Sequence, residues 1–115
     1  MVLMVKIKIT RSSSNEIRSI CASGHAGFAE HGSDIVCSAV SVLMQTAALG
    51  LERLGAEAGF YSVSDGRMKI FMPVLESVQD RDKASFLMET VSEAFFEIEK
   101  SYRGFIRVSS CNESR

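Results

Sequence analysis

The stretch from Ile35 to Leu51 constrains the fold most, because it is mainly apolar and carries no charged residue. A helix that is apolar on most of its faces is buried in a core, in an interface or in a membrane. The stretch is somewhat short for a bilayer core of about 30 Å. It also contains the polar residues Ser38, Ser41, Gln45 and Thr46. We therefore expect a buried core or interface helix and no contact with a membrane.

The segments before this helix have the pattern of a strand hairpin. Val2 to Thr10 alternates between apolar and polar residues in its second half, and Ile17 to Ala22 follows after a polar turn. The loop from Ser23 to Ser33 contains several glycines and has no periodicity. Ser33 or Asp34 can cap the helix that follows, which we expect to run to about Leu54 and to end at Gly55.

The second half of the chain repeats this order. Asp65-Gly66 suits a two-residue hairpin turn between residues 58–64 and 67–74. Residues 82–102 are expected to form a second helix, and residues 105–109 a last strand. The apolar residues at helical spacing are Phe86, Leu87, Val91, Phe95 and Ile98. The prediction is an α/β fold (α+β-like) with the order β-β-α-β-β-α-β, in which a mixed sheet of about five strands is covered by two helices.

The overall composition narrows the class of protein. A chain of 115 residues with a formal net charge of -1 is one domain without the basic excess of a typical nucleic-acid binder. We expect no direct nucleic-acid binding, although a local basic patch remains compatible with this charge. The cysteines Cys21, Cys37 and Cys111 form no CxxC pair and no disulfide framework. No signal peptide is recognisable at the start, and we expect a cytoplasmic protein.

Cys37 is a candidate nucleophile because of its place near the start of the predicted helix. With Ser33 or Asp34 as the cap, Cys37 falls in the first turn, where free backbone N–H groups and the helix dipole favour a thiolate. The two histidines of the chain, His25 and His31, precede it on the glycine-bearing loop. A Cys–His pair is an activated nucleophile, and the Ser41 hydroxyl, one turn further along, could hold the pair in register.

Two other interpretations of these residues stay open. A lone cysteine on an apolar helix is often a packing residue. His25, His31 and Cys37 could also be three metal ligands, but structural zinc needs four at tighter spacing, so we expect no metal. Cys21 and Cys111 are interpreted as structural thiols.

The residues from Gly24 to Ser41 resemble a known family. Gly24-His25-Ala26, then Gly32, then Asp34-Ile35-Val36-Cys37 and Ser41 are similar to the signature of the Prp family, the ribosomal-processing cysteine proteases of bacteria. The chain length and the order of elements agree over residues 1–115, which would form a single cysteine-protease domain. The resemblance implies a homodimer that needs no cofactor.

The resemblance also implies a substrate and a set of site residues. Family members remove the N-terminal extension of large-subunit ribosomal protein twenty-seven, with an aromatic residue before the cut. Their His/Cys dyad corresponds to His25 and Cys37, and their mobile substrate loop corresponds to residues 26–33. The supporting residues are Gly24 for close backbone approach, Asp34 as cap or as orienting group for His25, and Ser41. The loop residues in question are Gly27, Phe28, His31 and Gly32, among which His31 has no counterpart in the family pattern.

Two alternative functions remain at this point. The chain could be a non-catalytic assembly factor that only binds to the ribosome. It could also be a thiol hydrolase or acyl transferase of other specificity that uses the same dyad.

Overall fold

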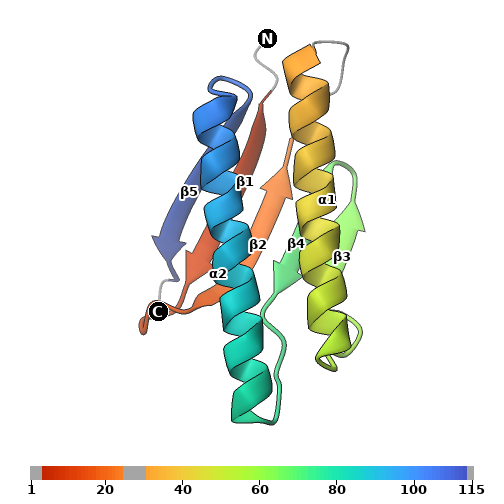
Figure 1. The fold of residues 1–115 in the computed structure, drawn as a ribbon, viewed down its shortest axis with the longest axis vertical. Coiled ribbons are helices and arrows are strands. Elements are labelled where there is room, and N and C mark those ends of the chain that lie inside the picture. Colours follow the sequence, from red (N-terminus) through yellow and green to blue (C-terminus); the bar gives the residue numbers. More distant parts are fainter. Residues whose placement is uncertain (1–3, 25–30, 114–115) are drawn as a thin grey trace.

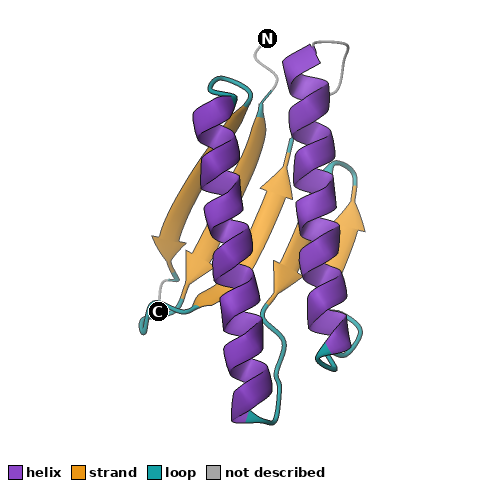
Figure 2. Ribbon diagram, viewed as in Figure 1, coloured by secondary structure: helices purple, strands orange, loops and turns teal. Residues whose placement is uncertain are grey.

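One mixed sheet and two helices make up the protein (Figures 1 and 2). The structure is a computed structural model that describes residues 4–24 and 31–113, with the backbone alone for residues 31–34. The elements in chain order are β1 (Val5–Arg11), β2 (Ile17–Ser23), α1 (His31–Arg53), β3 (Tyr61–Ser64), β4 (Arg67–Phe71), α2 (Val78–Ser101) and β5 (Ile106–Asn112). The predicted order β-β-α-β-β-α-β is confirmed.

The sheet has the strand order β3-β4-β2-β1-β5. All neighbouring strands are antiparallel except β1 and β5, which pair in parallel. Both helices cover the same face, a point that the sequence left open (Figure 1). The reason is topological: β2 and β4 point in opposite directions, and their crossovers run to opposite edges of the sheet. With the usual right-handed crossover, both helices then fall on one face.

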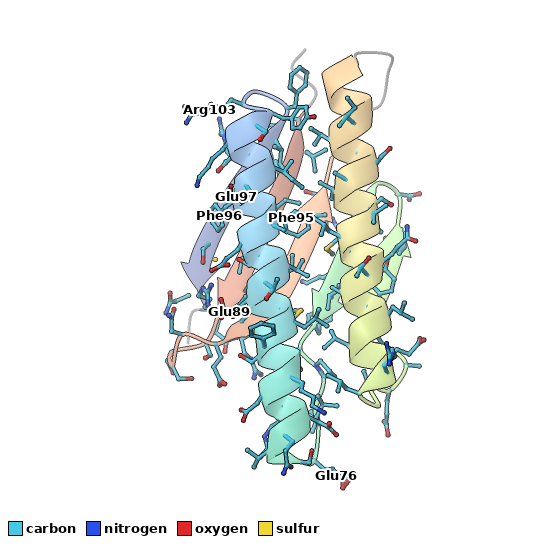
Figure 3. The ribbon with its side chains drawn as sticks, in the orientation of Figure 1. Glu76, Glu89, Phe95, Phe96, Glu97 and Arg103 are labelled. Carbon is cyan, nitrogen blue, oxygen red and sulfur yellow. The ribbon has the colours of Figure 1, made fainter. Side chains whose placement is uncertain are left out.

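The core lies between this sheet face and the helices. The strands contribute mainly branched aliphatic residues, namely Val5, Ile7, Ile9, Ile17, Ile20, Ile70, Ile106 and Val108. The helices contribute Val36, Val40, Met44, Ala47, Leu51, Ala84, Met88, Val91 and Phe95. Phe95, labelled in Figure 3, comes from the second half of α2 and is fully buried. A Cβ at Gly50 would lie 2.5 Å from the Leu87 Cδ2 atom, so this glycine allows the two helices to approach closely.

Helix α1, whose stretch from Ile35 to Leu51 carries no charge, is therefore part of the core. By length and composition alone, Ile35–Arg53 could cross a membrane, although the sequence analysis expected the uncharged stretch to be somewhat short for this. One side of the helix is buried against the sheet, as expected of a core helix, while Ile35, Val42 and Leu49 on the other side are 50%, 61% and 57% exposed.

Two local turn predictions are confirmed by backbone geometry. Asp65 and Gly66 both have positive φ, 28° and 74°, as in the primed turns that suit hairpins. Gly55 has φ +98°, and its N–H donates to the Glu52 carbonyl at 2.9 Å. The Ala56 N–H donates to the Leu51 carbonyl at 3.1 Å, which completes a Schellman motif at the end of α1.

Three predictions about the helices are wrong. Helix α1 begins at His31, so Ser33 and Asp34 lie inside its first turn and cannot cap it. The earlier start is possible because none of the residues from His31 to Asp34 prevents helical backbone. Helix α2 begins at Val78 rather than residue 82, with Ser77 as its N-cap. Phe86 is 76% exposed rather than in the core. It lies two residues, or about 200°, from the buried Ala84 and Met88 around the helix.

Candidate functional site

A cleft of about 580 Å³ lies between α1 and the β3–β4 hairpin, beside the end of β2. Its lining is mostly apolar. The residues are Val5, Ala22, Ser23, Gly24, Cys37, Val40, Ser41, Gln45, Tyr61, Val63, Gly66, Arg67 and Met68. Three of the predicted site residues, Gly24, Cys37 and Ser41, therefore line one cavity although they come from two elements.

Helix α1 supplies one wall of the cleft through residues one turn apart. Cys37, Ser41 and Gln45 have i, i+4 spacing and lie on the same side of the helix. The Cys37 side chain is half-buried. The Gln45 side-chain amide donates a hydrogen bond of 3.0 Å to the Ser41 hydroxyl oxygen. Gln45 was not predicted as a site residue, although its spacing from Cys37 and Ser41 was the signal.

Gly24 holds the opposite wall at the end of β2. It has φ +94°, and a Cβ there would lie 2.5 Å from the Met4 carbonyl oxygen. Its N–H donates to the Gly66 carbonyl at 3.2 Å, which joins the end of β2 to the hairpin turn. Both the positive φ and the close backbone approach require glycine. The role that the sequence suggested for this residue, in loop closure or backbone approach at the active site, stays a prediction.

Tyr61 and Arg67 complete the hairpin side of the cleft and were not predicted. Their signal in the sequence was their place on either side of the Asp65-Gly66 turn. The Tyr61 phenol is half-buried, and this burial raises its pKa above the usual value of a tyrosine. Arg67 is exposed at the rim, so the cleft combines an apolar floor with a cationic edge.

The remaining predicted site residues are placed only in part. His25, Gly27 and Phe28 lie outside the described residues. The backbone of His31, Gly32 and Asp34 forms the first turn of α1, so the expected loop to Ser33 is shortened by the helix.

This earlier helix start also changes the surroundings of Cys37. The residue lies in the second turn of α1 and not in the first. The attraction of a helix N-terminus for an anion falls off within the first turn. The helix start therefore stabilises a Cys37 thiolate less than the sequence analysis expected.

The other two cysteines lie away from the cleft. Cys21 is half-buried on β2, and Cys111 is exposed on β5. Among the residues whose side chains are described, no group of three or more His, Cys, Asp or Glu could hold a metal ion.

Comparison with known proteins extends these observations. The family model described as cysteine protease Prp matches residues 4–107. The ribosomal processing cysteine protease Prp of Bacillus subtilis is 29% identical over 109 residues, which cover 93% of this chain and 97% of that protein.

Solved structures show the same fold. The essential ribosomal processing protease Prp of S. aureus in complex with a substrate peptide has a TM-score of 0.78 at 23% identity, covering 94% of this chain and 100% of that chain. The same protease with a covalently linked product peptide has a TM-score of 0.77 at 24% identity, with coverage of 94% and 100%. A protein of Streptococcus mutans has a TM-score of 0.73 at 25% identity, with 96% of each chain covered. The family match over nearly all of the chain, together with this fold, means that the chain belongs to the Prp family of cysteine proteases.

Proposed function

We propose that this protein is an endopeptidase that removes the N-terminal extension of large-subunit ribosomal protein twenty-seven and so supports ribosome assembly. Cys37 is the proposed nucleophile and His25 the proposed base. The observation that carries the proposal is that Cys37 and Gly24 line the same cleft, and His25 directly follows Gly24 in the sequence. The curated B. subtilis relative, a ribosomal processing cysteine protease, supports the choice of a ribosomal protein precursor.

The reaction follows from this pair of residues. The Cys37 thiolate attacks the scissile carbonyl carbon, and the imidazolium of His25 gives its proton to the departing amine. Neutral His25 then takes a proton from water, which hydrolyses the acyl-enzyme and regenerates the thiol. The covalently linked product peptide in the S. aureus structure supports a covalent intermediate of this kind.

The described amides limit which groups can hold the oxyanion in this reaction. The N–H of Gly24 already donates to the Gly66 carbonyl, so it is engaged within the fold. Cys37 lies one turn beyond the free amides at the start of α1. The same distance from the helix start weakens the effect of the helix dipole on the Cys37 thiolate. We therefore assign most of the stabilisation of this thiolate to His25.

The cleft suits a peptide with an aromatic residue before the scissile bond. The side chains of Val40, Val63 and Met68 give its walls an apolar surface, and Tyr61 adds an aromatic ring. An aromatic side chain buries a large apolar area in such a pocket, which favours binding. The polar groups that fix the register of the peptide are Gln45 and Ser41 in this proposal.

Substitution of Cys37 tests the assignment of the nucleophile. We expect Cys37→Ala to abolish cleavage of a synthetic peptide that spans the precursor junction while thermal unfolding stays close to that of the wild type. Cys111→Ala is the matched control, because Cys111 is an exposed thiol outside the cleft. A folded Cys37→Ala variant that still cuts the peptide would refute the proposal.

Alkylation of the three cysteines separates catalysis from simple binding. Iodoacetamide at graded pH, read by mass spectrometry, should modify Cys37 at a lower pH than Cys21 and Cys111. The same experiment on a His25→Ala variant should remove this difference, because the imidazolium stabilises the thiolate. Equal rates at all three thiols with a substrate peptide bound would favour the non-catalytic assembly factor.

We also propose that two copies pair through the exposed side of α1. Ile35, Val42 and Leu49 are exposed and lie seven residues apart, so they form one stripe along the helix. An apolar stripe of this kind commonly pairs with a second helix. This homodimer would work in the cytoplasm, where the ribosomal substrate is made.

The oligomeric state tests the dimer. We expect a dimer mass in light scattering for the wild type, and a monomer for the double variant Val42→Glu/Leu49→Glu. Phe86→Glu is the control, because Phe86 is exposed on α2 and outside the stripe. A wild-type monomer at high concentration would contradict the proposal.

A further inference from the structure

We propose that the sheet face opposite the helices binds the phosphodiester backbone of single-stranded RNA. This surface, which we call the basic sheet face, is formed by the outward side chains of the strands. Its cations are Lys6, Lys8, Arg67, Lys69 and Arg107. The inference goes beyond peptide cleavage, because it assigns a second binding surface to the protein.

The strands carry charges of one sign, whereas the helices carry charges of both signs. Every charged residue within the five strands is Lys or Arg. The acidic residues that the structure describes lie in helices and loops, and Glu89 and Glu97 on α2 are examples (Figure 3). The net charge of -1 is thus a sum of two unlike surfaces. Because positive and negative residues cancel in this sum, the net charge alone argued against nucleic-acid binding.

Strand pairing brings the cations into two rows across the sheet. In the first row, Arg107 pairs with Lys6, Lys6 with Ser23, and Ser23 with Arg67. This row spans three strand spacings, or about 14 Å. In the second row, the paired residues are Ser109, Lys8, Cys21 and Lys69. Lys6 and Lys8 are two residues apart on β1, which separates the rows by about 7 Å.

Within residues 4–24 and 35–113, no carboxylate forms a salt bridge with these cations. Among the described residues, the salt bridges are Arg11–Glu89, Arg18–Glu113 and Lys100–Glu97, and none includes a cation of the basic sheet face. Lys6 and Arg107 are direct neighbours of like charge, which is unfavourable without an anion between them. Such a surface favours the binding of a polyanion.

The remaining side chains of the surface also suit a nucleic acid. Ser23 lies between Lys6 and Arg67 and Ser109 lies beside Lys8, and serine hydroxyls commonly donate to phosphate oxygens. Phe71 is 45% exposed at the edge of the surface, and the Lys69 Nζ atom lies 4.7 Å from its ring centroid. An open sheet face with cations and an exposed aromatic ring is a platform for a single strand.

The charge also argues against other occupants. In a symmetric dimer through this face, the same cations would face one another, which repels the copies. An insertion into lipid would need exposed apolar residues, and Phe71 is the large apolar side chain that this surface exposes. The choice of RNA over DNA rests on the proposed function, because the proposed substrate is a ribosomal protein, which binds ribosomal RNA.

Salt dependence gives the expected size of the effect. Each phosphate contact with a single strand contributes a slope of about −0.7 in log K against log salt. About five contacts give a slope of about −3.5, which weakens binding about a hundredfold between roughly 50 and 200 mM salt.

The test measures fluorescence anisotropy of a labelled single-stranded RNA of about 20 nucleotides with the full chain. The variant is the triple substitution Lys6→Gln/Lys8→Gln/Arg107→Gln, none of which lines the cleft. The matched control is Arg53→Gln/Lys83→Gln/Lys100→Gln, which removes the same charge from the helices. We expect the first variant to bind about a hundredfold more weakly at roughly 100 mM salt, with a slope less steep by about 2.

Several results would overturn the proposal. These are a wild-type slope shallower than about −1, an equal loss in both triple variants, or tighter binding of DNA of the same sequence than of RNA. Preferred binding to phosphatidylserine vesicles would also overturn it. Peptide cleavage is measured in parallel, because loss of cleavage in Cys37→Ala leaves RNA binding intact and keeps the two proposals separate. Should the variant unfold, the wild-type slope alone decides the question.

Discussion

Replacing Gly24 with alanine should destabilise the protein more than the same change at any exposed glycine of similar backbone angle. Gly24 has φ +94°, and Gly104 has φ +92°. A left-handed backbone costs a residue with a Cβ about 1–2 kcal/mol, so both substitutions lose this amount. At Gly24 the new Cβ would also lie 2.5 Å from the Met4 carbonyl oxygen, whereas nothing lies within 4 Å at Gly104.

The two variants therefore differ by the cost of relieving this contact. The contact is with backbone, so the start of β1 or the end of β2 must shift, at a cost of about 2 kcal/mol. For a domain of this size, 1 kcal/mol corresponds to about 4 °C in Tm. We expect Gly104→Ala to unfold about 6 °C below the wild type, and Gly24→Ala about 8 °C lower still.

Thermal unfolding followed by circular dichroism checks this difference, and urea unfolding at one temperature checks the free energy. Peptide cleavage below both unfolding transitions adds a functional measurement. Gly24→Ala should reduce kcat/KM more than Gly104→Ala, because Gly24 lines the cleft. Equal Tm values for the two variants would refute the reasoning, since the close approach to Met4 would then cost nothing.

Three smaller effects follow from side-chain contacts. Ser77→Ala removes the hydroxyl that accepts from the Asp80 N–H at 3.0 Å, and should cost about 1 kcal/mol, or about 4 °C in Tm. Glu89→Gln breaks the two-bond ion pair with Arg11, whose shorter contact is 2.8 Å. Because the Glu89 side chain is 40% exposed, we expect the free energy of unfolding to fall by less than about 1 kcal/mol, and by less still in high salt. Burial raises the pKa of Tyr61, so its contribution to stability is complete below about pH 10 and declines as pH rises above it, and Tyr61→Phe should remove this decline.

Each effect has a control and a result that would contradict it. Ser101→Ala at the other end of α2 should leave the Tm near that of the wild type, and a similar drop in both serine variants would argue against the cap. Glu93→Gln is the control for Glu89→Gln, because Glu93 is exposed on the same helix. A salt-independent loss at Glu89 would mean packing rather than charge. A Tyr61→Phe variant with the same decline at high pH would contradict the third prediction.

The order of elements could be predicted because its signals are local. The Asp65-Gly66 turn and the end of α1 at Gly55 depend on backbone angles that few residues adopt easily, so a short stretch reports them. The starts of the helices were harder, because serine and aspartate fit both a cap and a first turn. For α2 the signal was present, since Ser77 is followed three residues later by Asp80.

Long-range features of the site could not be predicted in this way. The cleft needs α1, the end of β2 and the β3–β4 hairpin to meet, and the positions of Tyr61 and Arg67 in it depend on the strand order. Phe86 shows a related limit. Where several apolar residues of a helix lie close together in the sequence, their spacing alone does not tell which of them faces the core. The pairing of Lys6 with Arg107 depends on the β1–β5 register, which no local pattern reports.

The parallel pairing of β1 with β5 has a consequence for how the protein is made. Val5, near the start of the chain, pairs with Ile106, near its end. A nascent polypeptide therefore leaves one edge of β1 open until β5, the last strand of the sheet, has left the ribosome. Deletion of a few residues of β5 should consequently harm maturation more than its small length suggests.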